Sequence, residues 1–403
     1  MNGGLLVART LERHGVRFLF TLCGGHISPI LVESKRLGLE VVDVRHEATA
    51  VFAADAVARL SGVPGVAAVT AGPGATNTIT AVKNAQLAQS PLVLLGGATA
   101  TVLDGRGSLQ DIDQLALFRP HVKWLASARR VRDLVPALEE AFRVAASGVP
   151  GPVFLECPVD LLYDESVVRE WYRTGSDGGS WRRRLQRLYL DLHLRRLFAG
   201  ADGAGDAAEP PPPAAVREAR RRQVARAAAL LERAERPVLL VGSQATLEAA
   251  RVERTAAAVE RLGLPTYLSG MARGLLGRRH ELHRRHQRRK ALKESDLVIL
   301  AGVPCDFRLD YGRQFGRTTR LVGANRSRRD LRLNRRPDLG ILADPGRFLV
   351  ALAEAVPPNG ERWSEWHRVL RSRDEARERE IDSGAAEEGD GVNPLRLFRE
   401  LDR

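Results

Sequence analysis

The chain has 403 residues, more than one ordinary hydrophobic core accommodates, so two or three domains are expected. Its hydrophobic content of 44% is typical of globular proteins, and no window approaches the roughly 18 consecutive apolar residues that a membrane span needs. The formal charge is +13, but only five of the 62 basic residues are Lys, and no nucleic-acid motif accompanies them. We therefore expect no nucleic-acid partner, and an anionic small ligand suits the basicity better.

The cysteines and the N-terminal sequence bear on the compartment. Cys23, Cys157 and Cys305 match no metal-binding spacing, and their odd number does not suit a disulfide framework. The first residues, MNGGLLVARTLERHG, contain a short apolar run that charged residues follow at once, which is not the pattern of a signal peptide. We therefore expect a reducing, intracellular environment.

Residues 1–165 alternate apolar runs of strand length with helical stretches. The expected strands are 18–20, 41–44, 66–70, 91–95 and 152–156, and glycine-rich turns follow three of them. Strands that alternate with helices form a parallel sheet with both faces covered, and ligands gather at the carboxyl ends of its strands. The pattern predicts a doubly wound α/β domain with a ligand site near these glycines.

Residues 166–235 have a different composition. We expect an Arg-rich helix over 181–198 and then an extended, Pro-rich linker over 200–215. One face of the helix gathers Trp181, Leu185, Leu188, Tyr189 and Leu192. This pattern favours a helix that packs on its own domain, and the alternative is a helix that binds a partner or lies on a membrane surface.

Residues 236–357 return to the α/β pattern, with expected strands at 237–241, 297–301 and 319–323. The fold class is therefore α/β, with two doubly wound parallel-sheet domains. Residues 358–403 are highly charged, and we expect an exposed helix followed by a flexible end. No G-x-G-x-x-G motif opens a helix after a strand, which argues against a simple nicotinamide-dependent dehydrogenase.

Two neighbouring segments of the first domain carry the chemistry. Residues 45–56 read RHEATAVFAADA and place Glu47 at the start of a helix, where the helix dipole alone would favour a Glu. Residues 70–78 read TAGPGATNT, a strand end followed by a tight turn that lets a ligand approach the backbone closely. In this order and spacing, the pair resembles the pyrimidine-binding domain of thiamine-diphosphate enzymes of the acetolactate synthase and 2-hydroxyacyl-CoA lyase group.

The resemblance implies thiamine diphosphate as the cofactor and assigns Glu47 its central role. In that family a glutamate hydrogen-bonds N1′ of the aminopyrimidine, so that the 4′-nitrogen can take the proton from C2 of the thiazolium ring. The resemblance also points to Gly72, Gly74 and Asn77 as cofactor-binding positions. For Asn77, as for Thr76, a helix-capping role is the alternative.

Five further positions of the first domain either match the family's motifs or lie beside residues that do. Gly24 and Gly25 match the loop that lines the neighbouring active site, and Gln110, in the sequence GSLQD, matches an active-site glutamine. His26 is either a proton shuttle or a loop residue without a role. We expect Cys23 to be a small buried residue, with a reactive thiol as the alternative.

The second domain is similar to the acyl-CoA lyase and oxalyl-CoA decarboxylase branch through its sequences GMARGLLG at 270–277 and GVPCDFRLDYG at 302–312. That branch binds an adenine nucleotide or CoA there, whereas acetolactate synthases bind FAD. The candidate contacts are Arg273, Asn325 and Arg326. The sequence NRSRR at 325–329 stands where relatives often have an Asp for ribose, and guanidinium groups suit phosphate. A solvated basic helix start is the alternative.

The resemblance implies a third domain that binds the diphosphate and Mg²⁺ through a GDG motif. Gly389-Asp390-Gly391 is not that motif, because no apolar strand precedes it and Asn393 follows almost at once. We expect the chain to hold two of the three domains, no metal ligand of its own, and a Mg²⁺ site in the third. Residues 393–398 match the helix that leads into that domain.

Three functions follow as expectations. The first is a lyase that cleaves 2-hydroxyacyl-CoA into a shortened aldehyde and formyl-CoA, and the second is an acetolactate synthase-type condensation of 2-oxo acids. The third is an inactive binding or dimerising fragment. The partners implied are an acyl-CoA or 2-oxo acid substrate, a second copy in a homo-oligomer, and peripheral contact with a membrane. The resemblance favours the endoplasmic reticulum membrane, although we find no anchor here, and the cytoplasm is the alternative.

Overall fold

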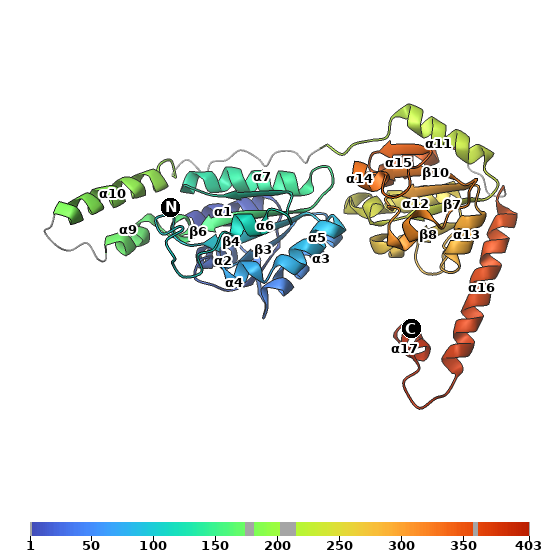
Figure 1. The fold of residues 1–403 in the computed structure, drawn as a ribbon, viewed down its shortest axis with the longest axis horizontal. Helices are drawn as coiled ribbons and strands as arrows, with labels where there is room; N and C mark the ends of the chain where they lie inside the picture. The colour runs from blue at the N-terminus through green and yellow to red at the C-terminus, as the bar shows by residue number, and fades with distance from the viewer. Residues whose placement is uncertain (1, 174–180, 202–214, 358–361, 403) are drawn as a thin grey trace. The chain divides into compact units, whose positions relative to one another are not determined.

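The computed structural model describes residues 2–173, 181–201, 215–357 and 362–402. The chain forms two compact units, Met1–Ala215 and Val216–Arg403. Each unit is built around its own parallel β-sheet with helices on both faces (Figure 1). The predicted fold class is thus confirmed for both units.

The first unit holds a six-stranded sheet in the order β2-β1-β3-β4-β6-β5, and all of its pairs are parallel. The chain runs from β1 outward to β2 and then returns to the other side of β1, where it forms β3. Strand order therefore reverses between β1 and β3, the position at which ligands of such sheets bind. The strands are β1 (Phe18–Leu22), β2 (Glu40–Asp43), β3 (Gly65–Val69), β4 (Leu92–Ala98), β5 (Trp124–Ser127) and β6 (Pro152–Pro158).

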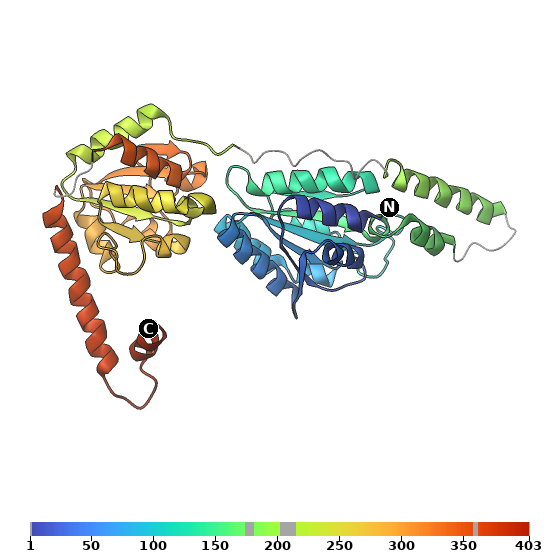
Figure 2. The same ribbon diagram turned by 180° about the vertical axis from the view of Figure 1, so that it is seen from behind.

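Alternate residues of these strands enter two separate cores. Leu19 faces one core and Phe20 the other, and the same alternation divides Val93 from Leu94. Figures 1 and 2 show α1 and α7 on one face of the sheet, and α3 and α5 on the other. The helices of this unit are α1 (Gly3–Arg13), α2 (Ser28–Arg36), α3 (Glu47–Ser61), α4 (Pro73–Thr76), α5 (Ile79–Ala88), α6 (Gln114–Phe118), η1 (Val131–Asp133), α7 (Leu134–Ala146), α8 (Val159–Leu162), α9 (Glu165–Arg173) and α10 (Trp181–Phe198).

Helix α10 spans the residues predicted for it, but the face that was expected to pack on the domain is exposed. The side chains of that face are between 46% and 66% exposed: Trp181, Leu185, Leu188, Tyr189 and Leu192. The helix packs instead through Leu194, Leu197 and Phe198, which lie in the first unit's core. Their spacing of three and four residues forms a short apolar stripe, whereas Arg residues interrupt the earlier turns.

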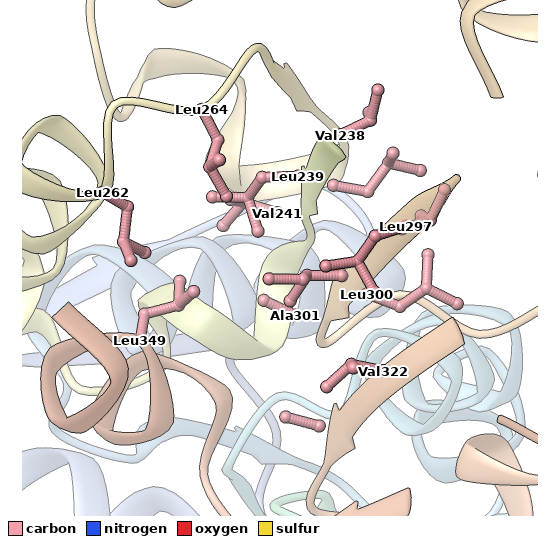
Figure 3. Close-up of a cluster of buried hydrophobic side chains, with 14 of the residues drawn as sticks. Val238, Leu239, Val241, Leu262, Leu264, Leu297, Leu300, Ala301, Val322 and Leu349 are labelled. Carbon is pink, nitrogen blue, oxygen red and sulfur yellow. The ribbon is translucent and has the colours of Figure 1, made fainter. Parts of the chain in front are cut away.

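The second unit holds a five-stranded parallel sheet in the order β11-β10-β9-β7-β8. Here strand order reverses between β7 and β9. Figure 3 shows the apolar side chains of these two strands packed with those of neighbouring elements, among them Val322 and Leu349. The strands are β7 (Pro237–Val241), β8 (Thr266–Leu268), β9 (Leu297–Ala301), β10 (Arg320–Asn325) and β11 (Leu339–Leu342).

The charged C-terminal segment begins inside the second unit's core. Trp363 and Trp366 are 3% and 5% exposed, and their indole nitrogens donate to the carbonyl oxygens of Ala234 and Pro237. The predicted exposed helix is therefore anchored at its start. The helices of this unit are α11 (Arg221–Arg233), η2 (Ser243–Thr246), η3 (Ala249–Arg251), α12 (Val252–Leu262), η4 (Gly270–Gly274), α13 (Arg288–Glu294), η5 (Phe307–Gly312), α14 (Arg328–Leu331), α15 (Pro345–Ala355), α16 (Ser364–Ala386) and α17 (Pro394–Leu401).

Among the residues that the structure describes, no helix combines the length and the apolar character needed to span a membrane.

Candidate cofactor site

The loops that follow β1 and β3 meet at the point where strand order reverses, and Thr70 lies between them. A Cβ atom added to Gly24 would lie 2.4 Å from Cβ of Thr70, and one added to Gly74 would lie 2.7 Å from its Cγ2. Side chains do not tolerate such distances, so both positions require glycine for the loops to close on Thr70. The structure thus brings Gly24 and Gly74 together, although fifty positions separate them in the sequence.

Glu47 is the first residue of α3 and is 7% exposed. His46 caps the helix by accepting a hydrogen bond from the backbone nitrogen of Ala48, which fixes the backbone of Glu47. The Oε2 atom of Glu47 accepts a hydrogen bond from Nδ2 of Asn77 at 2.9 Å. Its Oε1 atom accepts none from the described part of the chain and lies 3.5 Å from where a Cβ of Gly74 would be. The carboxylate therefore has one oriented oxygen and one that is available at the glycine loop.

Asn77 and Thr76 both follow the Gly-Pro-Gly turn, but their side chains have different hydrogen-bond partners. Asn77 is the C-cap residue of the short helix α4, but its side chain contacts Glu47 and does not cap the helix. Thr76 is exposed, and its hydroxyl donates to the carbonyl oxygen of Pro73. Asn77 thus lies beside the predicted catalytic carboxylate, whereas Thr76 has the local role of a turn residue.

Gln110 packs its backbone against the glycine turn. Gly72 has a φ of +61°, and a Cβ atom there would lie 2.9 Å from Cβ of Gln110 and 3.0 Å from its carbonyl oxygen. Gln110 itself has a φ of +63°, a left-handed conformation that costs free energy for a residue other than glycine. Its half-buried side chain lines a cavity of about 220 Å³ and makes no hydrogen bond within the described residues.

The same cavity contains polar residues that we did not predict. Gln114 is 2% exposed and donates from Nε2 to Oε1 of Glu156 at 2.9 Å and to the carbonyl oxygen of Gly97 at 3.0 Å. Its own Oε1 is buried and has no hydrogen-bond partner in the described part of the chain. No motif marks Gln114 in the sequence, because its partners come from strands β4 and β6.

The remaining residues of the loop after β1 differ in their burial and in their contacts. His26 lies against Thr70, with Nδ1 3.1 Å from its hydroxyl oxygen, and burial lowers the pKa of this histidine. Gly25 is exposed, and no atom lies within 4 Å of a Cβ added to it, so packing does not require glycine there. Cys23, which we expected to be buried, is exposed, because it follows the last residue of β1 and points away from both cores.

These residues fit the aminopyrimidine end of thiamine diphosphate. A buried carboxylate with an available oxygen suits a ring nitrogen that carries or shares a proton. Three glycines whose Cβ atoms would clash with neighbouring chain allow backbone to close around a flat ring. The described residues contain no group of three or more His, Cys, Asp or Glu placed to hold a metal ion.

Two of the three candidate residues of the second unit, Asn325 and Arg326, lie at the end of β10. Asn325 is 2% exposed, and its Oδ1 accepts from the backbone nitrogen of Ser327. The backbone of Arg326 donates to Gln244 in η2, and its guanidinium pairs with Asp344 at 2.7 Å and Glu248 at 3.3 Å. Arg326 is therefore held by carboxylates of its own unit.

Arg273 has a different environment from the other two. It lies on η4 and is exposed. Residue Met271 of the same helix donates from its backbone to Ser243 of η2, and Gly270 approaches Ser243 so closely that a Cβ would lie 2.3 Å from the hydroxyl oxygen. Arg273 is thus available at the carboxyl edge of the second sheet, near the point where strand order reverses.

An Arg-lined cavity of about 300 Å³ lies beside the edge strand β11 of the second unit. None of its guanidinium groups forms an ion pair with a carboxylate in the described part of the chain. We did not predict this cluster, because its members come from two distant segments, residues 217–220 and 328–336, which the fold brings together. They are Arg217, Arg220, Arg328, Arg332 and Arg336.

Comparison with known families matches both units. Residues 1–117 match the profile described as thiamine pyrophosphate enzyme, N-terminal TPP binding domain. Residues 224–352 match the profile described as thiamine pyrophosphate enzyme, central domain. The first match contains Glu47, Gly74 and Gln110, and the second contains Arg273 and Arg326.

Curated proteins similar to the chain include members of two named groups. The 2-hydroxyacyl-CoA lyase 2 of Danio rerio is 49% identical over 407 residues, covering 100% of this chain and 65% of the relative. The protein of that name from Homo sapiens is 48% identical over 404 residues, covering 99% and 63%. The acetolactate synthase large subunit IlvG of Mycobacterium tuberculosis (strain ATCC 25618 / H37Rv) is 34% identical over 404 residues, covering 100% and 66%.

The chain spans less than two thirds of the length of each of these relatives. Within that span, the parallel sheets, the glycine loops at the strand ends and the buried glutamate agree with the matched profiles. The chain therefore belongs to the thiamine pyrophosphate enzyme family, of which it carries the N-terminal and the central domain.

Proposed function

We propose that this chain supplies the pyrimidine-binding and central domains of a thiamine-diphosphate-dependent carbon–carbon lyase. Its substrate is a 2-hydroxyacyl-CoA, and its products are a shortened aldehyde and formyl-CoA. The observation that carries the proposal is the buried carboxylate of Glu47, which Asn77 orients while one oxygen stays available at the Gly74 loop. The names of the similar lyases, and their sequence identity of 48–49% to this chain, support the choice of substrate.

Glu47 is the residue on which the chemistry depends. When bound, thiamine diphosphate supplies a thiazolium carbon that becomes nucleophilic once it has lost its proton. Oε1 of Glu47 holds a proton at the ring nitrogen of the aminopyrimidine, and Asn77 keeps the carboxylate in the orientation that this requires. Glu47 is only 7% exposed, so little of the residue is in contact with water.

Two further residues of the first unit act on the substrate in this proposal. The pKa of His26 is lowered by burial, so the imidazole is neutral near pH 7 and can accept a proton. In the tautomer in which Nδ1–H donates to the hydroxyl oxygen of Thr70, Nε2 is the nitrogen that takes the proton of the substrate hydroxyl. The side-chain amide of Gln110 is without a partner in the described residues and orients a substrate oxygen.

For the second unit we propose an adenine nucleotide or the nucleotide part of CoA as the ligand. Five arginines around a cavity of about 300 Å³ beside β11 support phosphate binding. Arg273 is not part of that cavity, because it follows β8 at the opposite edge of the sheet. FAD is the alternative ligand. Flavin absorbance in the purified protein would show that FAD is bound. We further propose Mg²⁺ as a cofactor, bound with the diphosphate in the third domain that the family resemblance implies.

An acetolactate synthase-type condensation of 2-oxo acids is the second candidate, because the mycobacterial relative carries that name. A homo-oligomer, an intracellular location and contact with the endoplasmic reticulum membrane are further proposals from the resemblance, with the cytoplasm as the alternative. The exposed apolar side chains of α10 are the feature that supports membrane contact.

The decisive experiment expresses the protein from its complete native transcript and supplies thiamine diphosphate and Mg²⁺. Release of formyl-CoA from 2-hydroxyhexadecanoyl-CoA, with no acetolactate from pyruvate, supports the lyase. The reverse pattern supports the synthase, and no turnover of either substrate supports a non-catalytic protein. Under the lyase proposal, Glu47→Gln lowers kcat by about 10²-fold or more, since it removes the carboxylate that holds the proton.

A further inference from the structure

A cavity of about 850 Å³ opens beside His26 in the first unit. Its volume falls in the range of roughly 300–1,000 Å³ that is typical of small-molecule sites. The walls come from the loop after β4, from α9 and from α10, and their exposed surface is mainly apolar. The large side chains among them are Leu103, Leu109, Trp171, Tyr172, Tyr189 and Leu190.

The walls are joined by a buried hydrogen-bond network. Asp160 is fully buried, and its Oδ2 accepts from Oγ1 of Thr101 at 2.6 Å and from the hydroxyl of Tyr172 at 2.9 Å. The hydroxyl of Thr101 also lies 2.9 Å from Nε2 of His193. The network links the loop after β4 to α9 through Tyr172 and to α10 through His193. The cavity is thus a built feature of the unit, and its walls hold fixed positions.

One end of the cavity lies beside the candidate cofactor site. His26 lines the cavity, and its Nδ1 contacts Thr70, on which the loops of Gly24 and Gly74 close. The hydroxyl groups of Thr99 and Ser108 form a hydrogen bond to each other and also line the cavity. His26, Thr99 and Ser108 thus form a polar group in the lining, and the rest of the lining is mainly apolar, with Arg106 and Gln186 as further polar members.

We propose that this cavity receives the acyl chain of the substrate, with its hydroxylated carbon at the His26 end. The choice of ligand rests on the function proposed above. An amphipathic molecule with a polar head and a saturated chain matches both ends of the cavity. Leu103 and Trp171 are each 42% exposed and Leu109 is 81% exposed, so a chain that covers them removes apolar surface from water. The cavity then selects long straight chains over short ones.

The test is calorimetric titration of the full chain with 2-hydroxyhexadecanoic acid and with 2-hydroxybutanoic acid. Neither acid is a thioester, so binding is measured without turnover. Each buried methylene group adds about fourfold to the affinity, and the long acid is expected to bind at least a hundredfold more tightly. Equal affinity for the two acids would overturn the proposal.

Two variants and a matched control locate the bound chain. Leu190→Arg and Leu109→Arg each place a charge in the cavity from a different wall, and each should weaken binding of the long acid at least tenfold. Leu109 is largely exposed, so its replacement leaves the core intact. Leu188→Arg changes a residue of the same helix that is 66% exposed and does not line the cavity, and it should bind like the parent.

Three results would contradict the inference. The first is an equal loss in Leu188→Arg and Leu190→Arg. The second is a change from dimer to monomer in Leu190→Arg, together with binding affinities that do not depend on the length of the acid. This result would show that the cavity is occupied by a second copy of the protein. The third is formyl-CoA release by the protein from its complete transcript at the same rate for short and long acyl chains. Chain-length-dependent binding without formyl-CoA release would instead contradict the proposed reaction and leave the acyl site standing.

Discussion

Asn77 donates a hydrogen bond to Glu47 over 2.9 Å, although thirty positions separate the two residues in the chain. Glu47 opens the helix after β2, and Asn77 follows the turn after β3. The strand between them, β1, lies next to both, so the two loops reach the same edge of the sheet. Asn77 is therefore a positioning residue, since it acts through the carboxylate that it orients.

Removing the Asn77 side chain should change the orientation of the Glu47 carboxylate without changing substrate binding. In Asn77→Ala, Glu47 keeps its charge but loses the donor at Oε2, and we expect kcat to fall roughly ten- to hundredfold while the KM for acyl-CoA stays constant. Asn84→Ala is the matched control, because Asn84 donates to the carboxylate of Asp55 away from the site. Steady-state kinetics of both variants test this. An equal fall in the control, or a change in KM alone, would show that Asn77 has only a structural role.

The two adjacent glycines of the first loop should respond differently to alanine. In Gly24→Ala the new Cβ meets Thr70 at 2.4 Å, which we expect to lower the free energy of unfolding by about 1–3 kcal/mol. In Gly25→Ala the new Cβ meets no atom within 4 Å, and the change should stay within about 0.5 kcal/mol. Urea denaturation of the two variants measures both values. Similar losses at the two positions would contradict the packing described for Thr70.

The three cysteines should differ in reactivity. Cys23 is exposed, whereas burial raises the pKa of Cys157 to about 12 and that of Cys305 to about 11. At pH 8 the buried thiols are almost wholly protonated, and the thiolate is the reactive form. Iodoacetamide should therefore add one label to the native protein and three to the unfolded chain, as intact-mass spectrometry would show. Rapid labelling of Cys157 in the native protein would contradict its burial.

Asp160 should make stability depend on pH. Burial raises the pKa of this carboxyl above its ordinary value of 3.8, despite the hydrogen bonds from Thr101 and Tyr172. The folded protein thus retains a proton that the unfolded chain has already lost. Stability from this group is full below pH 3.8 and is lost as pH rises through the raised pKa.

The variant Asp160→Asn cannot titrate at this position and lacks that contribution. As pH rises above 3.8 and through the raised pKa of Asp160, the free energy of unfolding of the parent protein should decline relative to that of the variant. Urea denaturation at several pH values measures the difference in free energy of unfolding between the parent protein and the variant. Other titrating groups contribute equally to both proteins and therefore cancel. A constant difference over this range would show that Asp160 is ionised in both states.

The local features of the first unit could be read from the sequence. The apolar runs predicted β1, β3, β4 and β6, because strands buried on both faces of a sheet are continuously apolar. The start of α3 at Glu47 and the turn at Gly72 followed from residue types that favour helix ends and tight turns.

Features that depend on distant contacts could not be predicted. The short strands β5, β8 and β11 have three or four residues each, and their apolar runs are too brief to be distinguished from loop. The role of Arg326 depends on Asp344 and Glu248, which lie 18 and 78 positions away. The packing of α10 likewise depends on a core that its own periodicity does not reveal.

The segment that carries α9 and α10 follows β6, the last strand of its sheet along the chain. It contributes walls to the 850 Å³ cavity but no residue to the cluster around Glu47. A designer could therefore exchange residues 165–201 for the equivalent segment of another protein and keep every connection among the strands. Because the loop after β4 supplies another wall, such a chimera would take part of its preference for chain length from the donor and its reactivity from the recipient. Selectivity could then be adjusted without altering the chemistry.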